Sequence, residues 1–259
     1  MRVVIIGSGN AAHVLGKKIK EADHEIIQVV SRNLSHADEL ADALDSESGS
    51  LDGITADSEI YLLAISDSAL PDFHQRLQLK HGIVVHAAGS VSIKVLEKIS
   101  PNHGVLYPLQ SLRAEMQHTP EIPLLVDGNT PETLTLVEDF AETISSKVSR
   151  ANDEQRLKLH IAAVISNNFI NHLYTLTQSF CRKEKVDFSL LEPLIIETSE
   201  RLMNYSPEKL QTGPAMRNDQ DTINRNLEVL EPYPSLQKIY AFFSESIKQF
   251  YNSANSTSS

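Results

Sequence analysis

The chain has 259 residues, a formal net charge of −11 at pH 7 and a hydrophobic fraction of 41%. This composition is typical of a folded globular protein and excludes a disordered or fibrous chain. A negative charge without a cluster of Lys or Arg disfavours binding to nucleic acid. The one cysteine, Cys181, excludes an internal disulfide. No apolar run reaches the ~18 residues of a membrane helix, and the N-terminus lacks a signal-peptide pattern, so the sequence predicts a cytoplasmic protein without a membrane span.

The first part of the chain alternates short β-rich segments with helical patterns. The predicted strands are Arg2–Ile6, Glu25–Ser31, Glu59–Ile65, Gly82–His86, Gly104–Tyr107, Ile122–Val126 and Lys147–Arg150. Several are unbroken apolar runs, as strands buried on both faces of a parallel sheet require. Alternation of strands and helices with short connections predicts an α/β domain with a mostly parallel, doubly wound sheet.

The second part of the chain has a different pattern. Nine of the ten glycines lie at or before Gly128, and from about Ala151 the pattern is almost continuously helical. The predicted helices run from Asn152 to about Cys181 and over Leu190–Asn204, Asp219–Leu230 and Pro234–Tyr251. We therefore expect an all-α C-terminal domain over residues 152–259, after an α/β domain over residues 1–151. The first of these helices is apolar around much of its circumference, which favours either the centre of a helical bundle or a subunit interface.

A glycine-rich turn follows the first predicted strand. Gly7, Gly9 and Ala12 have the spacing G-x-G-x-x-A. The first glycine permits the tight turn, the second lets a diphosphate approach the backbone, and the small third residue keeps the helix close to the sheet. The predicted contacts of the diphosphate are Gly7, Ser8, Gly9, Asn10, Ala11 and Ala12. The pattern predicts a Rossmann domain that binds a dinucleotide at the N-terminus of its first helix.

The end of the second predicted strand indicates which dinucleotide is bound. Ser31, Arg32 and Asn33 stand where an NAD site has an acidic residue on the ribose 2′-hydroxyl. Two hydrogen-bond donors and a guanidinium suit a 2′-phosphate instead, so the sequence predicts NADP. The alternative is that Arg32 is simply a solvated loop residue.

Three further segments follow predicted strands at the edge where ligands of such sheets bind. Ala64, Ile65 and Ser66 are expected beside the cofactor, with the small residues 87–89 leaving room for ribose and nicotinamide. His86 is interpreted with equal weight as a cofactor-binding or a structural histidine. Tyr107 is interpreted as a packing residue.

Polar residues interrupt the long helix of the second part. His160, Asn167 and Asn171 fall on one narrow stripe at 100° per residue, with Asn168 on its flank. Such a stripe needs partners, which are either a cofactor and substrate or a buried hydrogen-bond network. Arg217, in the segment between two later helices, offers a fork for a carboxylate-bearing substrate or for an ion pair within the protein.

Several motifs together resemble a known family. They are Gly7-Ser8-Gly9-Asn10, His86-Ala87-Ala88-Gly89-Ser90, Tyr107-Pro108-Leu109-Gln110-Ser111, residues 160–169 and residues 213–223. They resemble NADP oxidoreductases that join a Rossmann-like domain to a helical C-terminal domain of unknown function, a group related to pyrroline-5-carboxylate reductase and to deazaflavin-dependent NADP reductases. The resemblance implies NADP binding and a helical domain that commonly dimerises. The chain departs from many relatives at Tyr107 and Asn226, where His is common.

The resulting hypothesis is an NADP-dependent oxidoreductase that transfers a hydride between nicotinamide and a small carbonyl or imine metabolite. His160 is the candidate proton donor, Asn168 the orienting residue and Arg217 the group that holds an anionic end of the substrate. The alternative is a non-catalytic NADP-binding sensor or scaffold, because no Lys–Asn or Ser–Tyr–Lys set is evident. The ten scattered histidines predict no metal site. We expect a homodimer formed through the C-terminal helices.

Overall fold

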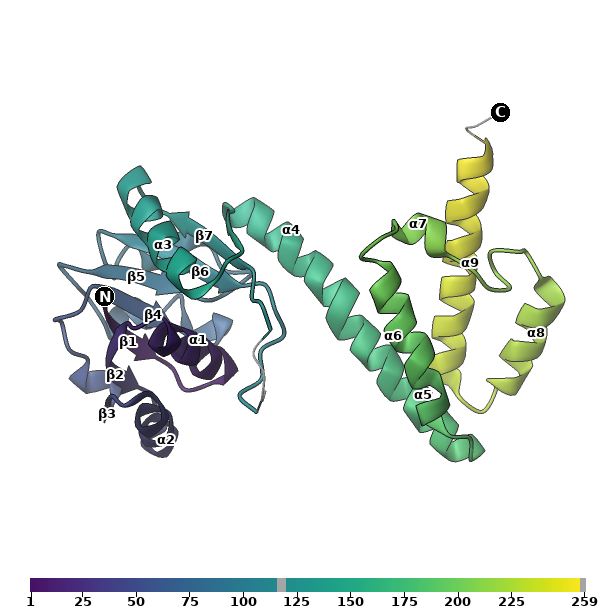
Figure 1. Ribbon diagram of the computed structural model, residues 1–259, viewed down its shortest axis with the longest axis horizontal. Helices are drawn as coiled ribbons and strands as arrows, with labels where there is room; N and C mark the ends of the chain where they lie inside the picture. The colour runs from purple at the N-terminus through teal and green to yellow at the C-terminus, as the bar shows by residue number, and fades with distance from the viewer. Residues whose placement is uncertain (116–119, 257–259) are drawn as a thin grey trace. The chain divides into compact units, whose positions relative to one another are not determined.

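The computed structural model describes residues 1–115 and 120–256. Contacts divide the chain into two compact units, Met1–Asn168 and Phe169–Ser259. The boundary expected from the sequence, between residues 151 and 152, coincides with the start of a helix inside the first unit. Each unit is described by itself (Figure 1).

The first unit is built on an eight-stranded sheet with the order β3-β2-β1-β4-β5-β6-β7-β8. The strands are β1 (Arg2–Ile6), β2 (Glu25–Val30), β3 (Glu47–Gly49), β4 (Ile60–Leu63), β5 (Ile83–His86), β6 (His103–Pro108), β7 (Leu124–Gly128) and β8 (Val148–Arg150). All neighbouring pairs are parallel except β6 and β7. The mostly parallel, doubly wound sheet expected from the sequence is therefore confirmed. The short edge strand β3 is an addition that the sequence pattern did not predict.

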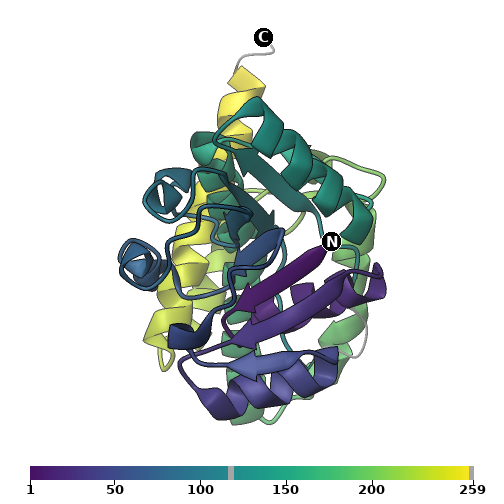
Figure 2. The same cartoon turned by 90° about the vertical axis from the view of Figure 1, so that its left-hand side faces the viewer.

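Both faces of the sheet are buried, and alternate residues of each strand supply the two cores. Val3 and Ile5 pack on the face covered by α1 (Asn10–Glu21), α2 (Leu34–Leu44) and α3 (Pro131–Ile144). Val4 and Ile6 pack on the opposite face. Each such side chain stabilises the fold by about 1.5–3 kcal/mol on burial. This two-sided burial is the reason that the central strands, drawn as arrows in Figure 2, are unbroken apolar runs.

The opposite face is covered by the segments on either side of β5, residues 65–82 and 87–100, whose only helical elements are short 3₁₀ turns. These turns are η2 (Asp67–Ala69), η3 (Phe73–Gln75) and η4 (Ile93–Leu96). Leu70, Phe73, Leu77 and Leu96 nevertheless bury their side chains against the sheet. The expected alternation of strands with regular helices is thus wrong in this part of the chain, where irregular backbone buries enough apolar surface to replace two helices.

A long helical segment begins at Asp153 and crosses the boundary between the units. It consists of α4 (Asp153–Ala163), a π-helical segment (Val164–Phe169) and α5 (Ile170–Glu184). Asn152 and Gln155 form the reciprocal capping box that their spacing predicts. The π segment was not predicted, and its wider turn changes the angular phase of the residues that follow. The stripe extrapolated from His160 to Asn171 at 100° per residue therefore does not hold.

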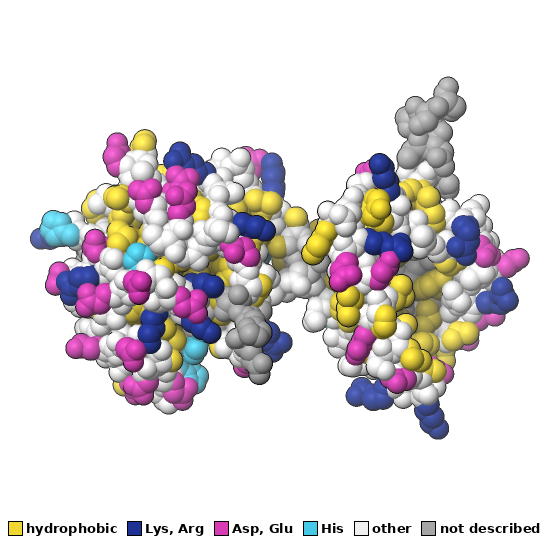
Figure 3. Space-filling view, in the orientation of Figure 1, with side chains coloured by type: hydrophobic (Ala, Val, Ile, Leu, Met, Phe, Trp, Pro, Cys, Tyr) yellow, Lys and Arg dark blue, Asp and Glu magenta, His cyan; other side chains and the backbone are white. Residues whose placement is uncertain are grey.

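Within the described residues, the second unit contains helices joined by turns and no strand. After α5 come η6 (Phe188–Leu191), α6 (Glu192–Arg201), α7 (Pro207–Leu210), α8 (Gln220–Val229) and α9 (Pro234–Ser256). Many apolar side chains remain exposed on this unit, where they are visible as yellow patches in Figure 3. Within the described residues, no helix is both long and apolar enough to span a membrane.

Candidate cofactor and substrate site

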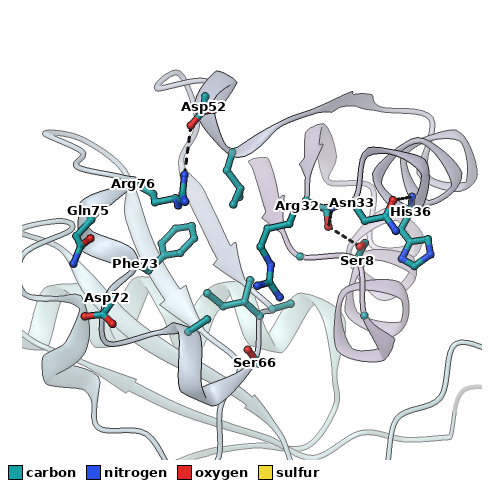
Figure 4. A pocket seen from close by; sticks show the side chains of 17 residues that line it. Ser8, Arg32, Asn33, His36, Asp52, Ser66, Asp72, Phe73, Gln75 and Arg76 are labelled. Atoms are coloured by element: carbon teal, nitrogen blue, oxygen red, sulfur yellow. Dashed lines mark hydrogen bonds and ion pairs between the residues drawn. The ribbon is translucent and has the colours of Figure 1, made fainter.

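A cavity of about 1090 Å³ opens at the carboxyl ends of β1, β2 and β4 (Figure 4). Nine residues expected at the cofactor from the sequence line it, namely Gly7, Ser8, Gly9, Ser31, Arg32, Asn33, Ala64, Ile65 and Ser66. Parallel strands end at the same edge of a sheet, so three turns that are distant in the sequence meet here. The volume is in the range of small-molecule and cofactor sites.

The two glycines of the first turn have different physical roles. Gly7 has a φ of +123°, and a Cβ there would lie 2.2 Å from the carbonyl oxygen of Ala64. Only glycine fits this position, because both the backbone angle and the space exclude a side chain. A Cβ on Gly9 would meet no protein atom within 4 Å. Gly9 therefore leaves a space that the protein itself does not fill.

The N-terminus of α1 faces this space. Gly9 caps the helix without any side-chain hydrogen bond. The N–H groups of Asn10, Ala11 and Ala12 are the first three of the helix and have no partner within it. An anion at this position would receive hydrogen bonds from the backbone and would be stabilised by the helix dipole.

Arg32 extends into the cavity from the turn after β2 (Figure 4). Among the described residues, its guanidinium forms no hydrogen bond or ion pair. Beside it, the hydroxyls of Ser8 and Ser31 are hydrogen-bonded at 2.8 Å, and Ser31 also accepts from the backbone N–H of Asn33 at 3.3 Å. The turn thus presents an unpaired cation and orientable hydroxyls to the cavity.

The opposite wall consists of residues that sequence reasoning missed. His36 of α2 lines the cavity beside Asn33 (Figure 4), and the opposite wall is formed by Leu51, Asp52, Ala69, Asp72, Phe73, Gln75 and Arg76. The Nη1 atom of Arg76 lies 3.7 Å from the Oδ1 atom of Asp52. No sequence signal marks these residues, because they belong to irregular segments and meet only through the packing of residues 51–76 on the sheet.

His86 does not line the cavity. It is fully buried at the carboxyl end of β5, where Nδ1 accepts a hydrogen bond from the backbone N–H of Ala88 at 3.2 Å. Its Nε2 has no hydrogen-bond partner among the described residues. Burial lowers the pKa of His86 to about 4, and the positive charge of Arg156 acts in the same direction. His86 is therefore neutral near pH 7 and unsuited to donate a proton.

Two hydrogen bonds connect β6 and the residues that follow it to the long helix. Tyr107 Oη lies 3.0 Å from His160 Nδ1, and the two rings are in edge contact with centroids 6.0 Å apart. In the π-helical segment that follows α4, Asn167 Nδ2 donates a hydrogen bond to Ser111 Oγ. The structure thus assigns partners to two residues of the predicted polar stripe. Tyr107, interpreted as a packing residue, also has a polar role.

An ion pair between the buried Arg156 and the partly exposed Asp153 fixes the start of α4 beside these residues. Arg156 is 1% exposed, and its Nη2 lies 2.6 Å from Asp153 Oδ1. Asp153 also accepts from the Ser92 hydroxyl and from the backbone N–H of Ile93. Burial would raise the pKa of Asp153, but these three donors outweigh it and lower the pKa.

The other two predicted catalytic residues have no comparable contacts. Asn168 is exposed within the π segment, one position beyond the residue that pairs with Ser111. Arg217 is exposed in the second unit, where its charge contributes to the low pKa of Asp219 after the hydrogen bonds from Thr222. Asp219 caps α8 through a hydrogen bond from the backbone N–H of Thr222. Among the described residues, no group of three His, Cys, Asp or Glu could hold a metal ion.

Comparisons with known proteins identify the family. Residues 2–89 match the family model described as NADP oxidoreductase, coenzyme F420-dependent, and residues 122–247 match a domain of unknown function. A solved structure from Bacteroides fragilis, provisionally named an NADP oxidoreductase, is 33% identical over 96% of this chain and 98% of its own, with a TM-score of 0.89. A comparison with curated proteins finds no match.

Two more distant structures share the fold. Pyrroline-5-carboxylate reductase from Streptococcus pyogenes is 15% identical over 96% of this chain and 98% of its own, with a TM-score of 0.63. Reductive aminase from Aspergillus terreus, solved with NADPH and a keto ester, is 14% identical over 99% of this chain and 94% of its own, with a TM-score of 0.64.

The chain belongs to the NADP oxidoreductases that combine a Rossmann-like domain with a helical C-terminal domain, as its motifs indicated. NADP is the cofactor of this family.

Proposed function

We propose that this protein is an NADP-dependent reductase that transfers a hydride between nicotinamide and a small carbonyl or imine metabolite. The observation that carries the proposal is the cavity at the sheet edge, where an open glycine turn and the unpaired guanidinium of Arg32 face the same space. The family and the keto ester bound to the distant reductive aminase support the same reaction class.

The lining residues fit NADP in chemistry and position. Gly9 leaves the room that a diphosphate needs, and the first turn of α1 offers its free N–H groups. Arg32, with Ser31 and Asn33, offers the charge and donors that a 2′-phosphate requires. Two carboxylates, Asp52 and Asp72, also line the cavity, and Arg76 offsets the charge of Asp52. Ala64, Ile65 and Ser66 form the floor towards which ribose and nicotinamide would extend.

The chemistry then needs a proton donor and an oriented substrate. Bound NADPH supplies the hydride. His160 gives a proton to the oxygen or nitrogen of the reduced group, since His86 is neutral and buried. Asn168 as orienting residue and Arg217 as the group for an anionic substrate end remain part of the proposal. The hydrogen bond between Ser111 and Asn167 adds a second amide to the candidates for orientation.

The cofactor assignment is tested by titrating the full chain with NADPH and NADH, monitored by calorimetry. We expect NADPH to bind at least about tenfold more tightly, because an Arg–phosphate contact contributes more than about 1.4 kcal/mol. Arg32→Ala is expected to remove this preference and to leave NADH affinity nearly unchanged. The matched control is Arg113→Ala, an exposed arginine whose ion-pair partner is Glu115. Equal binding of NADPH and NADH by the unmodified protein would contradict the assignment.

The reaction is tested by following NADPH oxidation with a panel of oxo acids, imines and lactams. His160→Ala is expected to lower kcat by about 10²–10⁴, the usual contribution of a positioned acid. Unchanged turnover would exclude His160 as the donor. Tight NADPH binding without turnover of any compound would instead favour the sensor or scaffold alternative.

We also propose that two copies associate through the C-terminal helices. In the single chain, large apolar side chains of α6 and α9, including Leu194, Ile196 and Phe242, are exposed. A contiguous apolar surface on a folded protein commonly marks an interface. The long helix also exposes apolar side chains in the single chain, namely Leu157, Ile161 and Ile165. Of the two interpretations of its apolar circumference, these exposed side chains favour a subunit interface.

A further inference from the structure

We propose that Tyr107 is a positioning residue for His160: its hydroxyl holds Nδ1, so that Nε2 is the ring nitrogen that carries the proton and faces a substrate. This inference rests on the proposed function, in which His160 is the proton donor. It adds to that function the ring atom that donates the proton, Nε2, and the residue that orients the ring, Tyr107.

The first argument is the geometry of the pair. Tyr107 Oη and His160 Nδ1 are 3.0 Å apart, and the ring planes meet at 67°. Tyr107 projects from β6 and His160 from α4, 53 positions later in the chain. Nδ1 and Nε2 lie on opposite edges of an imidazole. A contact that holds Nδ1 against Tyr107 therefore turns Nε2 away from it, and among the described residues Nε2 has no hydrogen-bond partner.

The second argument is the backbone of Gly89, which lies directly against both rings. A Cβ at this position would be 2.7 Å from His160 Nδ1 and 2.7 Å from Tyr107 Cζ. The φ of Gly89 is not in the left-handed region, so glycine is needed here for space alone. The small residues after β5 were expected to leave room for the cofactor. At Gly89, that room is occupied by the Tyr107–His160 pair.

The third argument concerns the direction of the hydrogen bond. Burial raises the pKa of Tyr107, the charge of Asp67 acts the same way, and Arg156 opposes them. The phenol therefore keeps its proton near neutral pH. Its half-buried hydroxyl has no other acceptor among the described residues, so it donates to Nδ1 of the neutral imidazole. The ring proton of neutral His160 is then on Nε2.

The same contact survives protonation of the ring. In the imidazolium both nitrogens carry protons, and the Tyr107 hydroxyl rotates to accept from Nδ1–H. When Nε2 gives its proton to the reduced substrate, the neutral imidazole left behind carries its proton on Nδ1, which donates to Tyr107. Solvent then returns a proton to Nε2, and loss of the Nδ1 proton to solvent restores the resting tautomer, in which the Tyr107 hydroxyl donates to Nδ1. Tyr107 thus keeps Nε2 directed at the substrate in each state without changing its own charge.

The test measures the ring nitrogens of His160 by ¹⁵N NMR in the full chain without cofactor or substrate, at a pH where the imidazole is neutral. The His160 signals are assigned by their loss in His160→Gln. We expect two widely separated signals, a protonated Nε2 and an unprotonated Nδ1. In Tyr107→Phe they should move towards each other, because the ring exchanges between tautomers. A protonated Nδ1 in the unmodified protein, or unchanged signals in Tyr107→Phe, would overturn the inference.

Two further variants separate positioning from general destabilisation. Gly89→Ala keeps both rings but places a methyl group between them, so it is expected to give the same spectral change as Tyr107→Phe. Tyr61→Phe is the matched control: it removes another buried phenol hydroxyl, which accepts from the Ser58 N–H at 3.1 Å, and is expected to leave the His160 signals unchanged. Because no NADPH is present, this result is independent of whether the reductase proposal succeeds.

Discussion

His86 shows how a buried environment decides the chemistry of one residue. The imidazole lies at the carboxyl end of β5, next to the expected nicotinamide position, but it has no exposed surface. Its pKa falls from 6.5 to about 4, first through burial and then through the positive charge of Arg156. A residue type that usually titrates near neutral pH is thereby held neutral, so proton donation passes to His160 in the proposal.

The low pKa of His86 predicts an acid-dependent loss of stability. The unfolded chain binds a proton below pH 6.5, whereas the folded chain binds it only below about pH 4. The free energy of unfolding is therefore unaffected above pH 6.5 and decreases as pH falls from 6.5 to 4, by up to about 3 kcal/mol. Urea unfolding across this range should show a shallower pH dependence in His86→Asn. The control His81→Asn removes an exposed histidine and should keep the slope. Parallel curves for all three proteins would disprove the assignment.

At the scale of single elements, the turn from β1 to α1 combines two glycines with opposite constraints. Gly7 is required by the protein itself, since a side chain would collide with Ala64. Gly9 is free of any such contact and is required only if a ligand occupies the turn. A substitution at Gly9 therefore separates binding from folding.

Gly9→Ala is expected to change the free energy of unfolding by less than about 1 kcal/mol, since the residue has extended backbone angles and open surroundings. The same methyl group should weaken NADPH binding at least about tenfold, because it occupies the space of the diphosphate. The control is Gly53→Ala, whose Cβ also meets no protein atom within 4 Å and which should retain full affinity. Unfolding monitored by circular dichroism and NADPH titration measure the two effects. Undiminished affinity in Gly9→Ala would place the diphosphate elsewhere.

At the scale of the whole molecule, the second unit exposes many large apolar side chains, and exposed apolar patches commonly mark interaction sites. Phe242 of α9 is 69% exposed and has Phe243 in edge contact at 5.7 Å between ring centroids. Exposed aromatic pairs of this kind are typical anchors of protein–protein interfaces.

We therefore expect sedimentation equilibrium to give the mass of a dimer. Phe242→Glu should raise the dissociation constant at least about tenfold, because it places a charge in an apolar contact. Lys238→Glu, also exposed on α9, changes charge without removing apolar surface and should have a smaller effect. A monomer at all concentrations would contradict the dimer proposal.

Short sequence patterns were sufficient to predict the central strands, the start of α4 and many of the residues that line the cavity. The apolar runs specified central strands such as β1 and β4, and Asn152 with Gln155 specified the start of α4, because these features depend on near neighbours in the chain. The glycine spacing and Ser31-Arg32-Asn33 likewise indicated the residues that now line the cavity. The π segment, the 3₁₀ turns of residues 65–100, the second cavity wall at Arg76 and the pairing of Tyr107 with His160 were decided only by tertiary structure. Each depends on packing between segments tens of residues apart, and periodicity carries no information about which distant side chains will meet.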